Sequence, residues 1–273
     1  MKSSTNTKRV SQSEGAESRP GSEVHTPSSG WPGLRIIGFL LVPLLWWLLH
    51  FAFDSPALPG PVESVARFFL LLADGLASHM LVSLGRVLVA IAISLAIGVP
   101  CGIALGRVKL LDRLFAPLVY LLYPVPKIAL LPVLLIVVGT GDLSRVLLLV
   151  LVLVFQIVLA VRDGAASVPE GWISLVRSFG AGRRQVLRTV ILPAVLPRMF
   201  TSLRIASATA LAVLFFAETY FTRLGLGYFI VDSWMRISYL DMFAGIIAMS
   251  LLGLGLFLGL DALERRFTGW SRR

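Results

Sequence analysis

The chain has 273 residues, 56% of them hydrophobic and only 15% charged, with a mean hydropathy of +0.84 and a formal net charge of +10. A soluble domain carries about 25% charged residues, so this composition excludes an ordinary soluble protein. The apolar residues come in blocks of about 20, the length of a membrane-spanning helix. The single cysteine, Cys101, excludes a disulfide framework. The sequence predicts an all-α, multi-pass membrane protein.

Residues 1–33 are polar and lack periodicity, which predicts a disordered cytoplasmic tail. Residues 34–273 predict one membrane domain with about six spans, at 36–53, 82–105, 115–138, 146–161, 200–219 and 240–260. The fourth of these spans is short. Between the first two, residues 59–80 predict a helix that is too short and interrupted to span and that lies along the outer interface.

Most of the 25 Lys and Arg residues fall in the tail, in the loops after the second and fourth spans, and at the C-terminus. Cytoplasmic loops accumulate basic residues, so both termini are predicted to be cytoplasmic. The same rule accounts for the positive charge without a nucleic-acid partner. Arg86, at the outer start of the second span, is expected to snorkel toward the headgroups as an anchor.

Small residues recur every four positions in two of the predicted spans. Gly98, Gly102 and Gly106 lie on one face of the second span and would let another helix approach closely. Gly255 and Gly259 are expected to do the same in the last span.

The loop at about 162–199 contains a helix with its own start and stop signals. Ser167, followed three residues later by Glu170, predicts a capping box, and Pro169 suits a first helical turn. Gly180 stands where a left-handed residue would end the helix. A second amphipathic stretch follows, and Pro193 is expected to break it before the fifth span.

The helix at 167–180 carries an apolar stripe, formed at i, i+3, i+4 and i+7 by Trp172, Leu175, Val176 and Phe179. Such a stripe favours two positions. The helix either rests on the lipid headgroups or docks into a groove on a cytoplasmic partner. The residues alone leave both open.

The third span is interrupted by prolines, of which Pro124, Pro126 and Pro132 flank Lys127. Lost backbone hydrogen bonds are tolerated at membrane depth where protein or a watery cavity covers them, and a broken span is a usual sign of a substrate path. Lys127 is expected either to lend positive potential to that path or to pair structurally, for example with Glu218. Glu218, at the outer end of the fifth span, is a tentative path residue or a partner for an arginine or a backbone donor.

The spacing from Gly180 through Val190 to Leu192 and Pro193 resembles the EAA loop of ABC-importer permeases, although Ser174 stands where that motif has glutamate. Three further segments, at 83–90, 123–145 and 217–230, resemble the nitrate, sulfonate, taurine and bicarbonate branch of that family: SLGRVLVA, YPVPKIALLPVLLIVVGTGDLSR and AETYFTRLGLGYFI.

The resemblance implies a type I importer fold in the bacterial inner membrane. It also implies that the chain is the permease subunit of an ATP-driven importer for a small anionic solute such as a sulfonate, nitrate or taurine. It implies a homodimer, two ABC ATPase subunits and an extracytoplasmic solute-binding protein. ATP and magnesium would be held by the ATPase, and this chain would carry no cofactor and no catalysis. The residues that would couple to the ATPase are Glu170, Trp172, Leu175, Val176, Phe179, Gly180, Leu192 and Pro193.

Two other classes of transporter remain as alternatives. An ion-coupled secondary transporter would need acidic residues within the membrane, and the predicted spans up to residue 211 contain none. An ABC permease for a non-anionic solute, such as a vitamin or a pyrimidine precursor, would share every feature above. A membrane-embedded enzyme is disfavoured because no P-loop, HExxH or GxSxG motif is present.

Overall fold

The computed structural model describes residues 32–269, in which every regular element is helical. The chain divides into two units, Met1–Leu45 and Trp46–Arg273, and only the helix α1 (Pro32–Phe53) runs from one into the other. The expected disordered tail at 1–33 lies almost wholly outside the described residues. The architecture below is that of the second unit.

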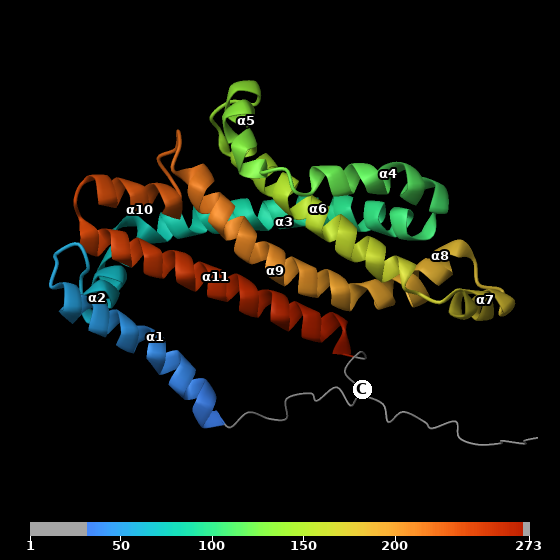
Figure 1. Cartoon of the computed structure of the whole chain (residues 1–273), viewed down its shortest axis with the longest axis horizontal. Coiled ribbons are helices and arrows are strands. Elements are labelled where there is room, and N and C mark those ends of the chain that lie inside the picture. Colours follow the sequence, from blue (N-terminus) through green and yellow to red (C-terminus); the bar gives the residue numbers. More distant parts are fainter. Residues whose placement is uncertain (1–31, 270–273) are drawn as a thin grey trace, which may run out of the picture. The chain divides into compact units, whose positions relative to one another are not determined.

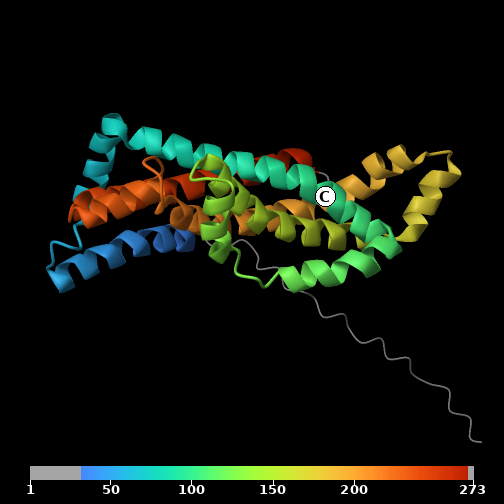
Figure 2. The same cartoon turned by 90° about the horizontal axis from the view of Figure 1, so that it is seen from above.

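Four long helices form the centre of this unit (Figures 1 and 2): α3 (Ala77–Arg107), α6 (Asp142–Ala166), α9 (Leu192–Glu218) and α11 (Tyr239–Phe267). α6 packs against both α3 and α9, while α11 packs against α9. Leucine and isoleucine side chains along α6 are fully buried, including Leu148, Leu149, Leu153 and Ile157. Protein surrounds most of α6, which explains why its apolar residues are distributed all around the helix.

Glycines set the close approach of α3 to α6. A Cβ atom at Gly98 would lie 2.8 Å from Ile157, and one at Gly102 would lie 2.7 Å from Val161. The small-residue face predicted from the sequence is confirmed. The same prediction for Gly255 and Gly259 is wrong for the described residues. A Cβ atom there would meet nothing within 4 Å, because α11 turns this face to an apolar cavity of about 880 Å³.

Shorter helices occupy the two ends of the bundle (Figure 1): α2 (Pro61–Leu71) and α10 (Leu226–Met235) at one end, and α7 (Glu170–Ser178) and α8 (Arg183–Val186) at the other. We call these the α10 end and the α7 end. The helix expected along the outer interface is α2, which packs against α11 and is joined to it by the Arg67–Asp241 ion pair at 2.6 Å. The chain then bends at Leu72–Leu76 to enter α3.

The predicted spans are mostly recognisable. Four helices are long and apolar enough to cross a membrane, a fifth candidate is the bent pair α4 (Lys109–Leu122) and Lys127–Val137, and Leu40–Phe53 is a shorter apolar helix. The fourth span is longer than expected, since α6 extends over 25 residues. The helix can include polar residues at its ends because Arg145 donates to the Gly141 carbonyl and Arg162 pairs with Asp112. The number of spans and the cytoplasmic termini stay predictions.

Candidate functional site

The helix α7 begins later than its sequence signals indicate. Its N-terminal residue is Glu170, and Pro169 precedes it in extended conformation. The predicted capping box is wrong, because Ser167 still belongs to the end of α6. Its amide donates to the Asp163 carbonyl at 3.1 Å and its hydroxyl donates to the Gly164 carbonyl. Glu170 instead accepts a hydrogen bond from Arg107 at 2.5 Å, which ties α7 to the end of α3.

The end of α7 forms as predicted. Gly180 has a φ of +83°, its amide donates to the Arg177 carbonyl at 2.9 Å, and the next amide, of Ala181, donates to Val176 at 3.4 Å. This pair of hydrogen bonds is the Schellman motif, which requires a left-handed residue. Open space surrounds Gly180, so the requirement is one of backbone conformation.

The apolar stripe of α7 is largely uncovered. Trp172, Leu175 and Phe179 are exposed, Phe179 to 84%, while Val176 is half-buried at the edge of the stripe. On the other side of the helix, Ile173 is only 2% exposed and packs into the bundle. α7 lies at one end of the bundle (Figure 1). It thus holds Ile173 against its own chain and leaves the apolar stripe exposed.

The stretch from α8 to α9 remains helical where a break was expected. One helix runs from Arg183 to Glu218, and a π-helical turn at Leu187–Ile191 precedes Pro193. The wider turn tolerates the missing amide of Pro193, and the prediction of a break there is therefore wrong. Leu192 and Pro193 form the first turn of α9 and are half-buried.

The third predicted span is broken. α4 ends at Leu122, a short 3-10 turn at Lys127–Leu130 follows, and α5 (Leu131–Val137) continues at an angle of 83° to α4. Pro124 and Pro126 lie in the break, and Pro132 lies in the first turn of α5. The break frees the last carbonyl groups of α4 from helical partners.

Lys127 supplies those missing partners. Its ammonium donates to the carbonyls of Leu122, at 3.1 Å, and of Tyr123, and it lies 5.1 Å from the ring centre of Phe155. A cation at the negative end of a helix is favourable. The pairing of Lys127 with Glu218 is not present, because each side chain has other partners.

Two adjoining cavities run beside this break. A cavity of about 290 Å³ contains Lys127 and one of about 500 Å³ contains Arg198, and both are lined by Tyr123 and Gln156. Their other polar lining residues come from α9: Thr201, Ser202 and Thr209. The polar side chains that line these two cavities were not predicted from the sequence. The signal for them was Gln156, the one amide in the otherwise apolar run 146–161.

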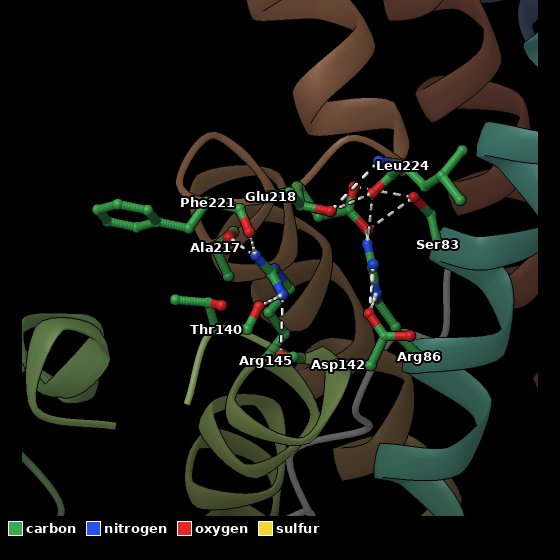
Figure 3. A network of polar contacts seen from close by, with 12 residues as sticks. Ser83, Arg86, Thr140, Asp142, Arg145, Ala217, Glu218, Phe221 and Leu224 are labelled. Atoms are coloured by element: carbon green, nitrogen blue, oxygen red, sulfur yellow. Dashed lines mark hydrogen bonds and ion pairs between the residues drawn. The ribbon is translucent and has the colours of Figure 1, made fainter. Parts of the chain in front are cut away.

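A buried charge network lies at the α10 end (Figure 3). Arg86 is only 5% exposed and donates to Glu218 at 2.6 Å and to Asp142 at 2.5 Å. Glu218 is fully buried and also accepts from the hydroxyl of Ser83 and from the amide of Gly227. The expected partnership of Glu218 with an arginine is confirmed. The snorkelling role of Arg86 is wrong, because its side chain is only 5% exposed and binds the buried carboxylate of Glu218.

Arg145 forms the second half of this network (Figure 3). Its side chain is buried and donates to backbone carbonyls on both sides, those of Thr140, Gly141, Ala217, Tyr220 and Phe221. The arginine thereby joins the loop before α6 to the loop after α9. Neither Arg145 nor Glu218 lines the two cavities beside Lys127.

The three segments that carried the family resemblance converge in this network. Arg86 comes from 83–90, Arg145 from 123–145 and Glu218 from 217–230. Gly225 is required for their approach, since a Cβ atom there would lie 2.6 Å from a Glu218 carboxylate oxygen. Metal-binding residues do not gather anywhere in 32–269: no three His, Cys, Asp or Glu side chains come together.

A bundle of apolar helices with a broken span and polar cavities beside it is typical of a membrane transport protein. Residues 96–269 match the family described as "Binding-protein-dependent transport system inner membrane component". This chain belongs to that family of ABC-transporter permeases and is a multi-pass protein of the inner membrane.

Individual relatives agree with this assignment. The taurine transport system permease protein TauC of Escherichia coli (strain K12) is 33% identical over 253 residues, covering 88% of this chain and 92% of TauC. The bicarbonate transport system permease protein CmpB of Synechococcus elongatus is 27% identical over 255 residues, covering 89% of this chain and 87% of CmpB.

A solved structure shares the fold. An inward-facing structure of the MetNI methionine ABC transporter aligns with a TM-score of 0.59 at 23% identity, covering 72% of this chain and 98% of that chain. The type I importer fold predicted from the sequence is confirmed.

Proposed function

We propose that this chain forms the translocation path of an ATP-driven importer and is driven by a separate ATPase that docks on α7. The outward apolar stripe of α7 carries the proposal. Trp172, Leu175 and Phe179 are exposed together on a helix whose position is held by the Arg107–Glu170 ion pair and by the Gly180 turn. An amphipathic helix of this kind suits a groove on a partner.

The assembly that we propose follows the family: two permease copies, two ATPase subunits and an extracytoplasmic solute-binding protein in the lipid bilayer. ATP and magnesium would bind in the ATPase, and this chain would contribute no catalytic residue. The coupling residues remain those named from the sequence, with Leu192 and Pro193 holding the start of α9. On this proposal the α7 end is cytoplasmic.

Truncating the stripe tests the docking. Phe179→Ala and Trp172→Ala should each reduce the ATPase recovered with the purified permease by about tenfold or more, since buried aromatic anchors carry ~2 kcal/mol or more of interface free energy. Ser174→Ala on the opposite side of α7, where the hydroxyl donates to the Glu170 carbonyl, is the control and should recover normal amounts. Equal recovery with all three variants would refute docking through the stripe and favour a helix that lies on lipid.

The solute that we propose is a small anion. TauC is named for taurine, which carries a sulfonate, and CmpB is named for bicarbonate. The Lys127 ammonium borders the 290 Å³ cavity beside the broken span and gives it positive potential. The path would include Pro124, Pro126, Lys127 and Pro132. Glu218 would shape the path indirectly, through the network at the α10 end.

Charge changes at Lys127 test this path. Lys127→Gln should slow uptake of an anionic solute by about tenfold, Lys127→Glu should slow it further, and Lys127→Arg should have a mild effect because it keeps the charge. Uptake rates are compared per inserted permease. If the Gln and Glu variants insert poorly but those that insert transport at the full rate, Lys127 only caps α4 and the anion path is refuted.

A further inference from the structure

A further cavity lies on the side of α7 that is opposite to the stripe. Its volume is about 460 Å³, which is in the range of small-ligand sites. It is an open pocket, lined by α7, α8, the turn at Leu187–Ile191 and the C-terminal end of α3. Three arginines line it together with apolar side chains: Arg107, Arg177, Arg183, Ile103, Ile173 and Val186.

The three arginines leave this cavity positively charged. Arg107 donates to Glu170, the one carboxylate that the structure places beside it. The guanidinium groups of Arg177 and Arg183 have no carboxylate within ion-pair distance in 32–269. Two positive charges at a cavity wall, with planar donors, suit a phosphate group, which guanidinium binds through paired hydrogen bonds.

The cavity stays available when α7 docks on a partner. Ile173 and Arg177 are one helical turn apart and line the cavity, Ile173 buried and Arg177 exposed at its rim, whereas the stripe of Trp172, Leu175 and Phe179 lies on the opposite side of α7. A partner that covers the stripe therefore leaves the cavity on the other side of α7 uncovered.

The apolar residues that line the cavity indicate which kind of molecule carries the phosphate group. Ile103, Ile173 and Val186 would be left wet by free phosphate, but they would contact the glycerol and upper acyl chains of a lipid. Basic pockets between helices at the cytoplasmic surface suit anionic lipid headgroups.

We infer that this cavity binds the phosphate group of an anionic phospholipid, which bridges the end of α3 to α7 and α8. The inference rests on the proposed function only in placing the α7 end at the cytoplasmic surface. A bound headgroup would hold α7 in place from behind while its stripe engages the ATPase.

Direct binding tests the inference without the ATPase. The purified full-length permease is placed in phosphatidylcholine nanodiscs with increasing phosphatidylglycerol, and retained phosphatidylglycerol is counted by native mass spectrometry. The double variant Arg177→Gln/Arg183→Gln should weaken retention at least tenfold, because it removes two charge-assisted contacts. The control Arg184→Gln/Arg188→Gln removes the same charge from two arginines that are exposed like Arg177 and Arg183 but do not line the cavity, and it should retain lipid normally.

Three results would overturn the inference. Equal loss in both double variants would mean that only surface charge attracts the lipid. The melting temperature of the permease is also measured in pure phosphatidylcholine nanodiscs with inorganic phosphate. If inorganic phosphate raises it as much as phosphatidylglycerol does, the cavity binds free phosphate. Normal lipid retention by Arg177→Gln/Arg183→Gln would by itself show that these arginines do not hold the lipid, and weaker recovery of the ATPase alongside it would assign them to the partner protein. None of these results depends on transport, so failure of the proposed function is distinguishable.

Discussion

Glu218→Ala is expected to destabilise the permease by about 3–5 kcal/mol, because it removes one partner of a buried ion pair. Arg86, only 5% exposed, would keep only Asp142 as a carboxylate partner, and that residue's side chain is 67% exposed. The Ser83 hydroxyl and the Gly227 amide would lose their acceptor in a buried position. The loss is measured as the unfolding midpoint of the detergent-purified protein in a graded denaturant series.

Two variants sharpen this test. Asp142→Asn keeps an acceptor for Arg86 at an exposed position and should cost less than ~1 kcal/mol. The double variant Glu218→Ala/Arg86→Met removes both buried charges and should recover part of the stability lost by Glu218→Ala alone. If Glu218→Ala unfolds at the same midpoint as Asp142→Asn, the network at the α10 end does not stabilise the fold as the burial of its charges indicates.

Gly180→Val is expected to leave insertion normal and to abolish uptake, with weaker recovery of the ATPase. The φ of +83° is strained for a residue with a side chain by about 1–2 kcal/mol, and more for a β-branched one. The strain is relieved when the Schellman turn opens, which moves Phe179 and the end of the stripe. Uptake and ATPase recovery are measured on the same membranes.

Asparagine at the same position provides the matched control. Gly180→Asn keeps a residue that tolerates the left-handed conformation, and no neighbouring atom within 4 Å obstructs its side chain. It should transport close to normally. Full uptake by Gly180→Val would contradict the role of α7 as the coupling helix, and equal loss in both variants would show that glycine is needed for contact with the partner.

Features that depend only on residues close together in the sequence could be predicted. The end of α7 at Gly180 and the break around Pro124 and Pro126 each follow from local backbone chemistry. The close packing of α3 against α6 at Gly98 and Gly102 follows from helical periodicity. Two local signals failed: Pro193, whose missing amide the π-helical turn tolerates, and Ser167, which lies between two helix ends. Whether it starts α7 or ends α6 depends on how far α6 extends, and packing in the bundle decides that.

The choice of partners could not be predicted. Arg86 and Glu218 are 132 residues apart, and their ion pair exists because α3 and α9 approach each other at the α10 end. Lys127 had two expected roles, a positive charge on the path or a structural partner of Glu218, but the 83° break places its ammonium at the last carbonyls of α4. Gly255 and Gly259 have the same spacing as the α3 glycines and meet no helix in the described residues.

By itself, the sequence determined the membrane class, the helical type and the family of this protein, together with the amphipathic helix that ends at Gly180. These rest on composition, on periodicity within one helix and on short motifs, all of which are local along the chain. Only the tertiary structure decided which charges pair, which glycines are covered and which face of α7 stays exposed. Those outcomes depend on distances between segments far apart in the chain, and no local pattern encodes such distances.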